Sequence, residues 1–244
     1  MSDLYNNMIS RQKEILDEKQ QEIIRTTPVA VVGCGGLGGT VIEQLVRAGF
    51  ENLTIVDKDV FDETNLNRQV RSNVDTIGLS KVQSTQDFLK KINPDVNIDS
   101  YDMSLNEDNI PEVLKGNKIV IDAVDNVYTR VMISREATNQ NIPFVHAAVE
   151  KTAGQLSIFK PNSISYEELF GLKSLDLSLS DAEDYLLSIS KNKPQVFGFT
   201  PSIFASLEVS ETIKYLLDMD DVVLAPKVLM WDIFDITSFR LIDF

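Results

Sequence analysis

Short apolar runs alternate with polar segments of helical period through the first two thirds of the chain. In the polar segments apolar residues recur every three or four positions, and Gly, Asn or Pro separates the two kinds of segment. This alternation predicts an α/β fold, a mostly parallel sheet with helices on both faces in a doubly wound, Rossmann-like order. The expected strands are 28–32, 53–57, 97–103, 118–124 and 143–149, and the expected helices run from the glycine-rich turn to about residue 49, over 80–92, near 108–115 and over about 127–140.

The pattern changes after Gly154. One more strand is expected at 155–161, a Ser-, Leu- and Asp-rich stretch without a strand follows, and a long amphipathic helix covers 201–217, before strand-like runs at 227–235 and 238–244. The charged segment 8–25 predicts helices packed on the rest. We therefore expect a single domain over 1–244, made of an N-terminal helical segment (1–27), an α/β core (28–160), a crossover connection (161–200) and a C-terminal helix with extension strands (201–244).

The charge balance limits the partners. Lys and Arg number 23 against 37 Asp and Glu, so the net charge of −14 would repel nucleic acid. The polar N-terminus lacks the apolar region of a signal peptide, and no run reaches the roughly 20 apolar residues of a membrane span. The only cysteine, Cys34, permits neither a disulfide within the chain nor a cysteine-based zinc site. We expect a cytoplasmic protein that binds neither nucleic acid nor membranes.

A glycine-rich turn joins the first strand to its helix. Gly33, Gly35 and Gly38 have the G-x-G-x-x-G spacing of a phosphate-binding turn, with Gly36 between them. Asp57 ends the second strand 24 residues after Gly33, near the offset at which an acid binds a ribose hydroxyl. The alternative is that Asp57 and Asp59 only form a turn. These residues predict a nucleotide site and leave NAD and ATP equally open.

The next loop favours a triphosphate. Asn65, Arg68 and Gln69 follow the acid-bearing strand, and Lys81 begins the next helix. Two cations exceed what a dinucleotide needs, whereas they suit a triphosphate whose α-phosphorus is attacked while pyrophosphate leaves. Arg68 as a surface arginine and Lys81 as an ordinary helix lysine are the alternatives. A lysine in the first turn of a helix opposes the helix dipole, which points to another role for Lys81.

The fourth strand carries a further acid to the same edge of the sheet. Asp125 in DAVDN is expected either to hold Mg²⁺ against phosphates or to cap the next helix. The only histidine, His146, is expected to be a core or strand-end residue rather than a catalyst.

Taken together, these motifs resemble the MoeB/ThiF/HesA family, the bacterial and archaeal relatives of the ubiquitin-activating enzymes. The resemblance covers most of the chain. Its motifs are SRQ (10–12), GCGGLGG (33–39), LTIVDKD (53–59), NLNRQ (65–69), GLSKV (78–82), DAVDN (122–126) and EVSETIKYLL (208–217). It implies an adenylyltransferase that binds Mg-ATP and whose carboxylate substrate attacks the α-phosphorus, giving an acyl-adenylate and pyrophosphate.

The resemblance also implies roles for single residues. Asp57 would hold the ribose and Asp125 the magnesium ion, while a homodimer would bring Arg11 into the partner's site. The triphosphate would be bound by Asn65, Arg68, Gln69 and Lys81, and the rest of the nucleotide by Gly33, Gly35, Gly36, Gly38, Asp59 and Asn126. No histidine base is required, because the attacking carboxylate is ionised at neutral pH.

The chain departs from the family in its cysteines. Many members bind structural zinc through two C-x-x-C pairs, and some carry a transfer cysteine in the crossover connection; this chain has neither. We therefore expect no zinc, a reaction that ends at the adenylate, and a separate acceptor for the acyl group. Cys34 lies in the glycine turn, where a helix N-terminus lowers a thiol pKa, but packing is the favoured interpretation.

The owner of the carboxylate stays open at this point. It is either the C-terminal glycine of a ubiquitin-like sulfur carrier or a small molecule. Among the zinc-free relatives, one modifies threonylcarbamoyl-adenosine in tRNA, against which the net charge of −14 argues, and HcgE acts on the guanylylpyridinol of iron-hydrogenase cofactor assembly. Aromatic and apolar residues of the crossover would line a pocket for either substrate or belong to the core: Tyr166, Phe170, Leu172, Phe197 and Phe199. An NAD-dependent oxidoreductase and a non-enzymatic nucleotide-binding scaffold are the other classes weighed; the first would leave Arg68, Lys81 and Asp125 without roles.

Overall fold

The computed structural model describes residues 3–191 and 195–244, so the expected segments 1–27 and 161–200 are described except for 1–2 and 192–194. Within these residues one sheet has the strand order β3-β2-β1-β4-β5-β6-β7-β8. The first five strands are parallel and β6, β7 and β8 are antiparallel additions. The strands are β1 (Val29–Val32), β2 (Asn52–Asp57), β3 (Asn97–Asp102), β4 (Ile119–Asp122), β5 (Phe144–Glu150), β6 (Ala153–Phe159), β7 (Lys227–Asp232) and β8 (Arg240–Asp243). The predicted α/β fold class is confirmed.

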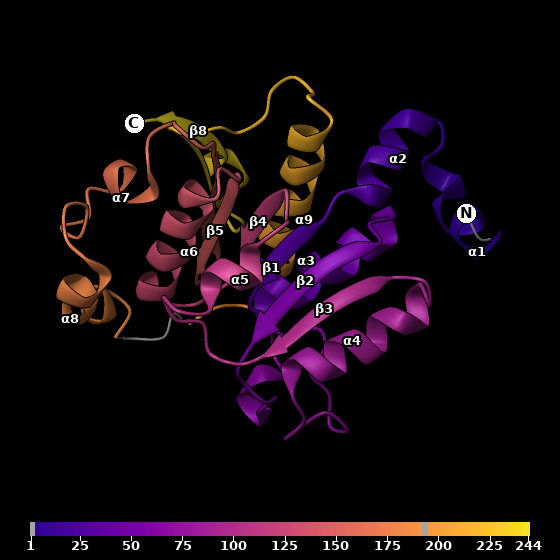
Figure 1. The fold of residues 1–244 in the computed structure, drawn as a ribbon, viewed down its shortest axis with the longest axis horizontal. Helices are drawn as coiled ribbons and strands as arrows, with labels where there is room; N and C mark the ends of the chain where they lie inside the picture. Colours follow the sequence, from indigo (N-terminus) through magenta and orange to yellow (C-terminus); the bar gives the residue numbers. More distant parts are fainter. Residues whose placement is uncertain (1–2, 192–194) are drawn as a thin grey trace.

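Helices cover both faces of the sheet (Figure 1). One face carries α3 (Gly36–Ala48), α4 (Lys81–Ile92) and α9 (Phe199–Leu216), and the other carries α5 (Ile110–Leu114) and α6 (Val127–Asn139). The remaining helical elements are α1 (Asp3–Met8), η1 (Ile9–Gln12), α2 (Glu18–Thr26), η2 (Glu63–Asn65), α7 (Tyr166–Leu169), α8 (Leu179–Ile189) and η3 (Ile236–Ser238). No described helix is both long and apolar enough to cross a bilayer.

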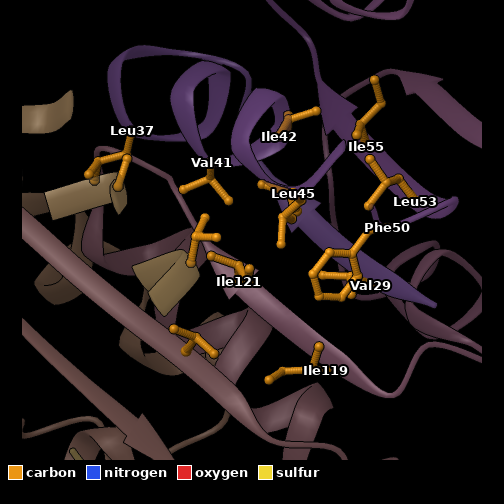
Figure 2. Close-up of a cluster of buried hydrophobic side chains, with 14 of the residues drawn as sticks. Val29, Leu37, Val41, Ile42, Leu45, Phe50, Leu53, Ile55, Ile119 and Ile121 are labelled. Carbon is orange, nitrogen blue, oxygen red and sulfur yellow. The ribbon is translucent and has the colours of Figure 1, made fainter. Parts of the chain in front are cut away.

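The core beside the glycine-rich turn is formed by α3 against β1, β2 and β4. Figure 2 shows Val41 and Leu45 of α3 directed at Ile121 and the neighbouring strand residues. Alternate residues of β4 belong to opposite cores, because successive strand side chains point to opposite faces. This packing fixes the start of α3 at the carboxyl ends of the parallel strands.

The N-terminal segment packs on the far end of α3. The hydroxyl of Tyr5 donates to the carbonyl of Gly49 at 2.9 Å, and Nε2 of Gln12 donates to the carbonyl of Ala48 at 2.8 Å. Helix begins at Asp3, earlier than the expected residue 8, because Tyr5 and Ile9 are buried against this end of α3.

Candidate active site

A cavity of about 200 Å³ lies where β1, β2 and β4 end. The strand order reverses between β1 and β4, and ligands of open α/β sheets bind at such a point. The cavity wall contains Gly33 after β1, Asp57 at the end of β2 and Asp125 after β4. The predicted nucleotide residues that line it are Gly33, Gly35, Gly36, Asp57, Asp59, Arg68, Gln69, Lys81, Asp125 and Asn126.

Close packing requires glycine at two positions of the turn. Gly33 has φ +104°, and a Cβ there would lie 2.5 Å from the carbonyl oxygen of Ala123. A Cβ at Gly38 would lie 1.7 Å from the carbonyl oxygen of Gly33, so Gly38 brings α3 close to the turn rather than lining the cavity. The N-cap of α3 is Gly35, which offers no side-chain acceptor. The first N–H groups of α3 are therefore available to an anion such as phosphate.

Asp57 is anchored by the backbone of this turn. Its Oδ2 accepts from the N–H of Cys34 at 2.7 Å and its Oδ1 from the N–H of Asp59 at 2.9 Å. Burial raises the pKa of Asp57, while these two hydrogen bonds lower it in part. Two anchored oxygens at the cavity wall present acceptor lone pairs in a fixed place, as a pair of ribose hydroxyls requires.

Two cations reach the cavity from different elements. Lys81 begins α4 and is buried, and its Nζ lies 3.2 Å from Oδ2 of Asp59. Arg68 is half-buried and donates through Nη1 to the carbonyl of Thr64 at 2.7 Å and to Oδ1 of Asn67 at 2.9 Å. The aliphatic part of the Lys81 side chain is held by packing, whereas the guanidinium of Arg68 is held by hydrogen bonds to its own loop.

The loop after β4 bears Asp125, for which two roles are expected: the cap of the next helix or a ligand of Mg²⁺. Asn126 is the N-cap of α6, since its Oδ1 accepts from the N–H of Thr129 at 2.8 Å. The alternative interpretation of Asp125 as this cap is therefore wrong, and Asp125 lines the cavity. The described residues hold no cluster of three His, Cys, Asp or Glu side chains able to bind a metal by themselves. One carboxylate together with substrate phosphates suits Mg²⁺, which keeps several of its waters.

Asn65 and Arg11 do not line the cavity. Asn65 is buried, and its Oδ1 accepts from the N–H of Asp62 at 3.1 Å to close a capping box on η2. Arg11 is exposed on η1, beside Gln12, which contacts the C-terminal end of α3. The cavity lies at the other end of this 13-residue helix, roughly 18 Å away. Arg11 cannot reach the cavity of its own chain.

The aromatic residues of the crossover divide into two groups. Tyr166 is buried and packs on Phe170, with ring centroids 4.8 Å apart, as part of the core. Phe197 and Phe199 are exposed and stack on each other with centroids 5.4 Å apart. None of these residues lines the cavity at the strand ends.

A buried polar chain behind the cavity was missed by sequence reasoning. Asp122, at the end of β4, accepts from Nε of Arg130 and lies 2.9 Å from Nδ1 of His146. Nε2 of His146 lies 3.1 Å from Nε2 of Gln155 on β6. The expectation that His146 is a core residue is confirmed, since it is fully buried. The only sequence signal for the chain was the acid–arginine pair Asp122 and Arg130 in DAVDNVYTR.

Burial and neighbouring charges determine the protonation states of Asp122, Arg130 and His146. Burial, together with the Arg130 charge, lowers the pKa of His146 to about 4. Burial alone would raise the pKa of Asp122, but Arg130 and His146 lower it below its ordinary value. Similarly, Asp122 outweighs burial and raises the pKa of Arg130. At neutral pH, Asp122 and Arg130 therefore form an ionised pair beside the neutral imidazole of His146.

Two further cavities continue from the first. One of about 150 Å³ shares Gly36, Arg68 and Asp125 with it. A wider one of about 1000 Å³ shares Asp125 and Arg130 with the second cavity and extends to Gln155. The three cavities form a series from the strand ends outward.

This geometry agrees with what known proteins share with the chain. The sequence profile of the ThiF family matches residues 7–243. The chain belongs to the ThiF family. The predicted resemblance is thereby confirmed.

Several ThiF-family relatives have named activities. The chain is 31% identical to the SAMP-activating enzyme E1 of Haloferax volcanii, over 91% of the chain and 80% of that protein. It is 33% identical to the molybdopterin-synthase adenylyltransferase of Haemophilus influenzae, over 63% and 64%. It is 31% identical to the adenylyltransferase and sulfurtransferase MOCS3 of Culex quinquefasciatus, over 94% of the chain and 51% of that protein. Two of the three are named adenylyltransferases and the third an activating enzyme, as the prediction of an adenylyltransferase requires.

Solved structures share the fold of this ThiF-family chain. The crystal structure of E. coli MccB with ATP matches with a TM-score of 0.79 and 20% identity, over 100% of this chain and 73% of that one. The crystal structure of PaaA matches with a TM-score of 0.78 and 21% identity, over 99% and 83%. At this identity the likeness concerns the fold alone.

Proposed function

We propose that this ThiF-family protein activates the C-terminal carboxylate of a ubiquitin-like carrier protein by adenylylation with ATP. The observation that carries the proposal is one cavity that combines an uncapped helix N-terminus, the anchored carboxylate of Asp57 and the cation Lys81. A dinucleotide would use the first two features. Lys81, Arg68 and Asp125 at the same cavity suit a triphosphate that loses pyrophosphate.

Each side chain has a role that follows from its position. The first N–H groups of α3 would bind phosphate oxygens, and the two oxygens of Asp57 would accept from the ribose hydroxyls. Lys81 would supply a point charge to the phosphates, with Asp59 as its partner in the free enzyme. Arg68 would leave its loop contacts and bind the departing pyrophosphate through two parallel hydrogen bonds.

The reaction requires no protein nucleophile. A carboxylate oxygen of the substrate attacks the α-phosphorus and forms a P–O bond, the bond from that phosphorus to the β-phosphate bridging oxygen breaks, and pyrophosphate takes its electron pair. The substrate carboxylate is ionised at neutral pH, so no general base is needed. The protein contributes alignment of the two reactants and stabilisation of charge on the departing oxygens.

Asp125 would hold the magnesium ion of the nucleotide. It is a hard oxygen ligand on the cavity wall, which fits a cation shared with phosphate oxygens. The ion, when bound, neutralises phosphate charge. The chain has no C-x-x-C pair, so we propose that it functions without zinc.

A carrier protein is the favoured carboxylate donor. The cavity next to the first holds only about 150 Å³, and small or apolar residues such as Ala123, Ala148 and Val149 make up most of its wall beside the charged Arg68, Asp125 and Arg130, so an extended chain ending in glycine fits it better than a broad ring system. The Haloferax relative is named for activating SAMP, and the Haemophilus relative for acting on molybdopterin synthase. Because the chain lacks a transfer cysteine in its crossover, the adenylate would pass to a separate acceptor.

We further propose that the active unit is a homodimer. Arg11 cannot reach the cavity of its own chain, because Gln12 fixes the neighbouring backbone at the opposite end of α3. If Arg11 contributes to catalysis, the arginine must come from a second copy.

ATP–pyrophosphate exchange tests the proposed function. The purified protein is incubated with Mg-ATP, labelled pyrophosphate and one carboxylate at a time: a ubiquitin-like carrier ending in Gly-Gly, the same carrier without its last two residues, and guanylylpyridinol. We expect exchange with the intact carrier alone. Exchange with guanylylpyridinol alone would replace the carrier by a small molecule. Tight NADH binding without detectable Mg-ATP binding would overturn the adenylyltransferase assignment for this chain.

A further inference from the structure

The widest of the three cavities has both a hydrogen-bond donor and an acceptor on its wall. It is lined by Arg130 of α6 and Gln155 of β6, and it connects to the phosphate end of the site through Asp125. Its volume of about 1000 Å³ exceeds what a carboxyl group needs. The polar groups on its wall are therefore placed to contact the part of the substrate that follows the carboxylate.

The buried chain behind this wall fixes the orientation of the Gln155 amide. Asp122 is ionised and only accepts, so Nδ1 of His146, 2.9 Å away, carries the proton and donates. His146 is neutral, so its Nε2 is left as an acceptor. The atom of Gln155 that lies 3.1 Å from it must then be the amide nitrogen. Consequently the Gln155 oxygen is the atom left to accept from a ligand in the cavity.

The carboxylate of Asp122 also fixes the guanidinium of Arg130, the hydrogen-bond donor on the cavity wall. Asp122 accepts from Nε of Arg130, and Nη2 of Arg130 donates to the carbonyl of Val124 at 2.8 Å. Arg130 also has a side-chain hydrogen bond with Tyr166. A guanidinium has five N–H groups and Arg130 lines both outer cavities, so donors beyond these three contacts remain for a ligand. Arg130 and His146 contact the same oxygen of Asp122. The Arg130 donor and the Gln155 acceptor, which His146 orients, are therefore held in a fixed position relative to each other.

We propose that Arg130 and Gln155 form a subsite for a secondary amide on the chain that carries the substrate's carboxylate. Arg130 donates to the amide carbonyl oxygen, and Oε1 of Gln155 accepts from the amide N–H. His146 is a positioning residue, because its bare Nε2 determines which end of the Gln155 amide faces the substrate. The subsite rests on the proposed function and selects carboxylates at the end of a peptide over carboxylates on a ring system without an amide.

An ester scan tests the subsite on the substrate side, where folding of the enzyme is not affected. The probe is an acetyl-capped hexapeptide ending in Gly-Gly, assayed by ATP–pyrophosphate exchange. Analogues replace one amide N–H at a time by an ester oxygen, which removes the donor and keeps the chain length. We expect one analogue to have a KM raised roughly tenfold with kcat nearly unchanged, because the acceptor of Gln155 loses its partner.

Two variants of the enzyme are assayed with the same amide and ester peptides. In Gln155→Leu the parent peptide should show the raised KM, and the sensitive ester should cost nothing further. Gln195→Leu is the matched control, because Gln195 lines the same cavity and is exposed, and its side chain is outside the His146 chain. It should keep the full ester effect. A change of stability alone would lower the apparent kcat for all peptides alike and would not abolish the difference in KM between amide and ester.

The outcomes separate the subsite from the proposed function. Exchange with the parent peptide but an equal KM for every ester would overturn the subsite and leave the adenylyltransferase intact. An ester effect that survives in Gln155→Leu would also overturn the subsite. Failure of both the peptide and the intact carrier to support exchange would overturn the proposed function itself.

Discussion

The ammonium of Lys81 lies 3.2 Å from a carboxylate oxygen of Asp59, although the two residues are 22 positions apart. Asp59 also accepts the backbone N–H of Lys81 through its carbonyl, at 3.0 Å. The start of α4 is thereby tied to the loop after β2, and a buried lysine stem delivers its charge to the cavity. The exposed carboxylate of Asp59 is thus the ion-pair partner that a phosphate would replace in the proposed reaction.

We predict that Lys81→Ala lowers adenylation by roughly 10²-fold or more, because it removes a charge that acts on the departing pyrophosphate. Lys90→Ala is the matched control, since Lys90 is exposed in the last turn of the same helix. Exchange rates and urea unfolding are measured on both variants. Nearly normal exchange in Lys81→Ala would remove Lys81 from the site. Equal losses in both variants would assign the effect to net charge.

The sequence predicted those parts of the site that are local in the chain. The glycine turn, Asp57 at the end of β2 and Lys81 at the start of α4 each follow from short-range spacing, and the structure brings them to one cavity. Asn65 shows the limit of such reasoning. It lies in the correct loop, but a three-residue capping box directs its oxygen to Asp62 instead of the cavity.

The buried polar chain was beyond prediction because its members lie on three strands and a helix. Asp122, His146 and Gln155 meet only through the register of β4 on β5 and of β5 on β6. Register depends on the whole sheet and leaves no signal in a short motif. Strand ends were overestimated for a related reason: Ala123 and Val124 are as apolar as a strand, but they leave β4 to line the cavity.

We predict that Arg11 acts in trans. Arg11→Ala and Lys81→Ala should each be inactive, and mixing them under conditions of subunit exchange should restore roughly a quarter of the activity, because half of the dimers are hybrids with one intact site. Sedimentation in parallel reports the oligomeric state. A fully active monomer would contradict this prediction, as would normal activity of Arg11→Ala alone.

We predict that His146 makes the protein less stable in weak acid. Burial lowers the pKa of His146 from 6.5 to about 4, so between these values the unfolded chain binds a proton that the folded chain does not. Stability is therefore complete above pH 6.5 and falls as the pH is lowered toward 4, by at most about 1.4 kcal/mol per pH unit. Urea unfolding at pH 7, 6 and 5 checks the slope. His146→Gln should flatten it, and an unchanged slope in that variant would contradict the prediction.

Glu208 should have the opposite effect on stability. It is fully buried in α9, both of its carboxyl oxygens lack a partner among the described residues, and burial, followed by Asp122, raises its pKa well above the ordinary value. For a raised acid pKa, stability is complete below the unfolded value and is lost as the pH rises. We predict that Glu208→Leu raises the free energy of unfolding by about 1–3 kcal/mol, and more at pH 8 than at pH 5.

Glu211, one turn along the same helix, is the matched control for Glu208. One of its oxygens accepts from the N–H of Val223 at 2.8 Å and the other from Nζ of Lys214 at 2.8 Å. Glu211→Leu should therefore lower the free energy of unfolding while Glu208→Leu raises it. Loss of stability in both variants would show that solvent or another partner satisfies the Glu208 carboxyl group.

We predict that Cys34 takes no part in the chemistry. A thioester needs a thiolate within reach of the acyl carbon, but burial raises the pKa of the Cys34 thiol well above its ordinary value, and its side chain is fully buried in the core under α3. Cys34 supports the site through its backbone N–H, which donates to Asp57 and is present in any residue. Cys34→Ala should therefore keep full exchange activity, with a packing cost of about 1 kcal/mol in unfolding. Intact-mass spectra after incubation with ATP and carrier should show no covalent acyl adduct; a thiol-sensitive adduct that disappears in Cys34→Ala would place a transfer step on this chain.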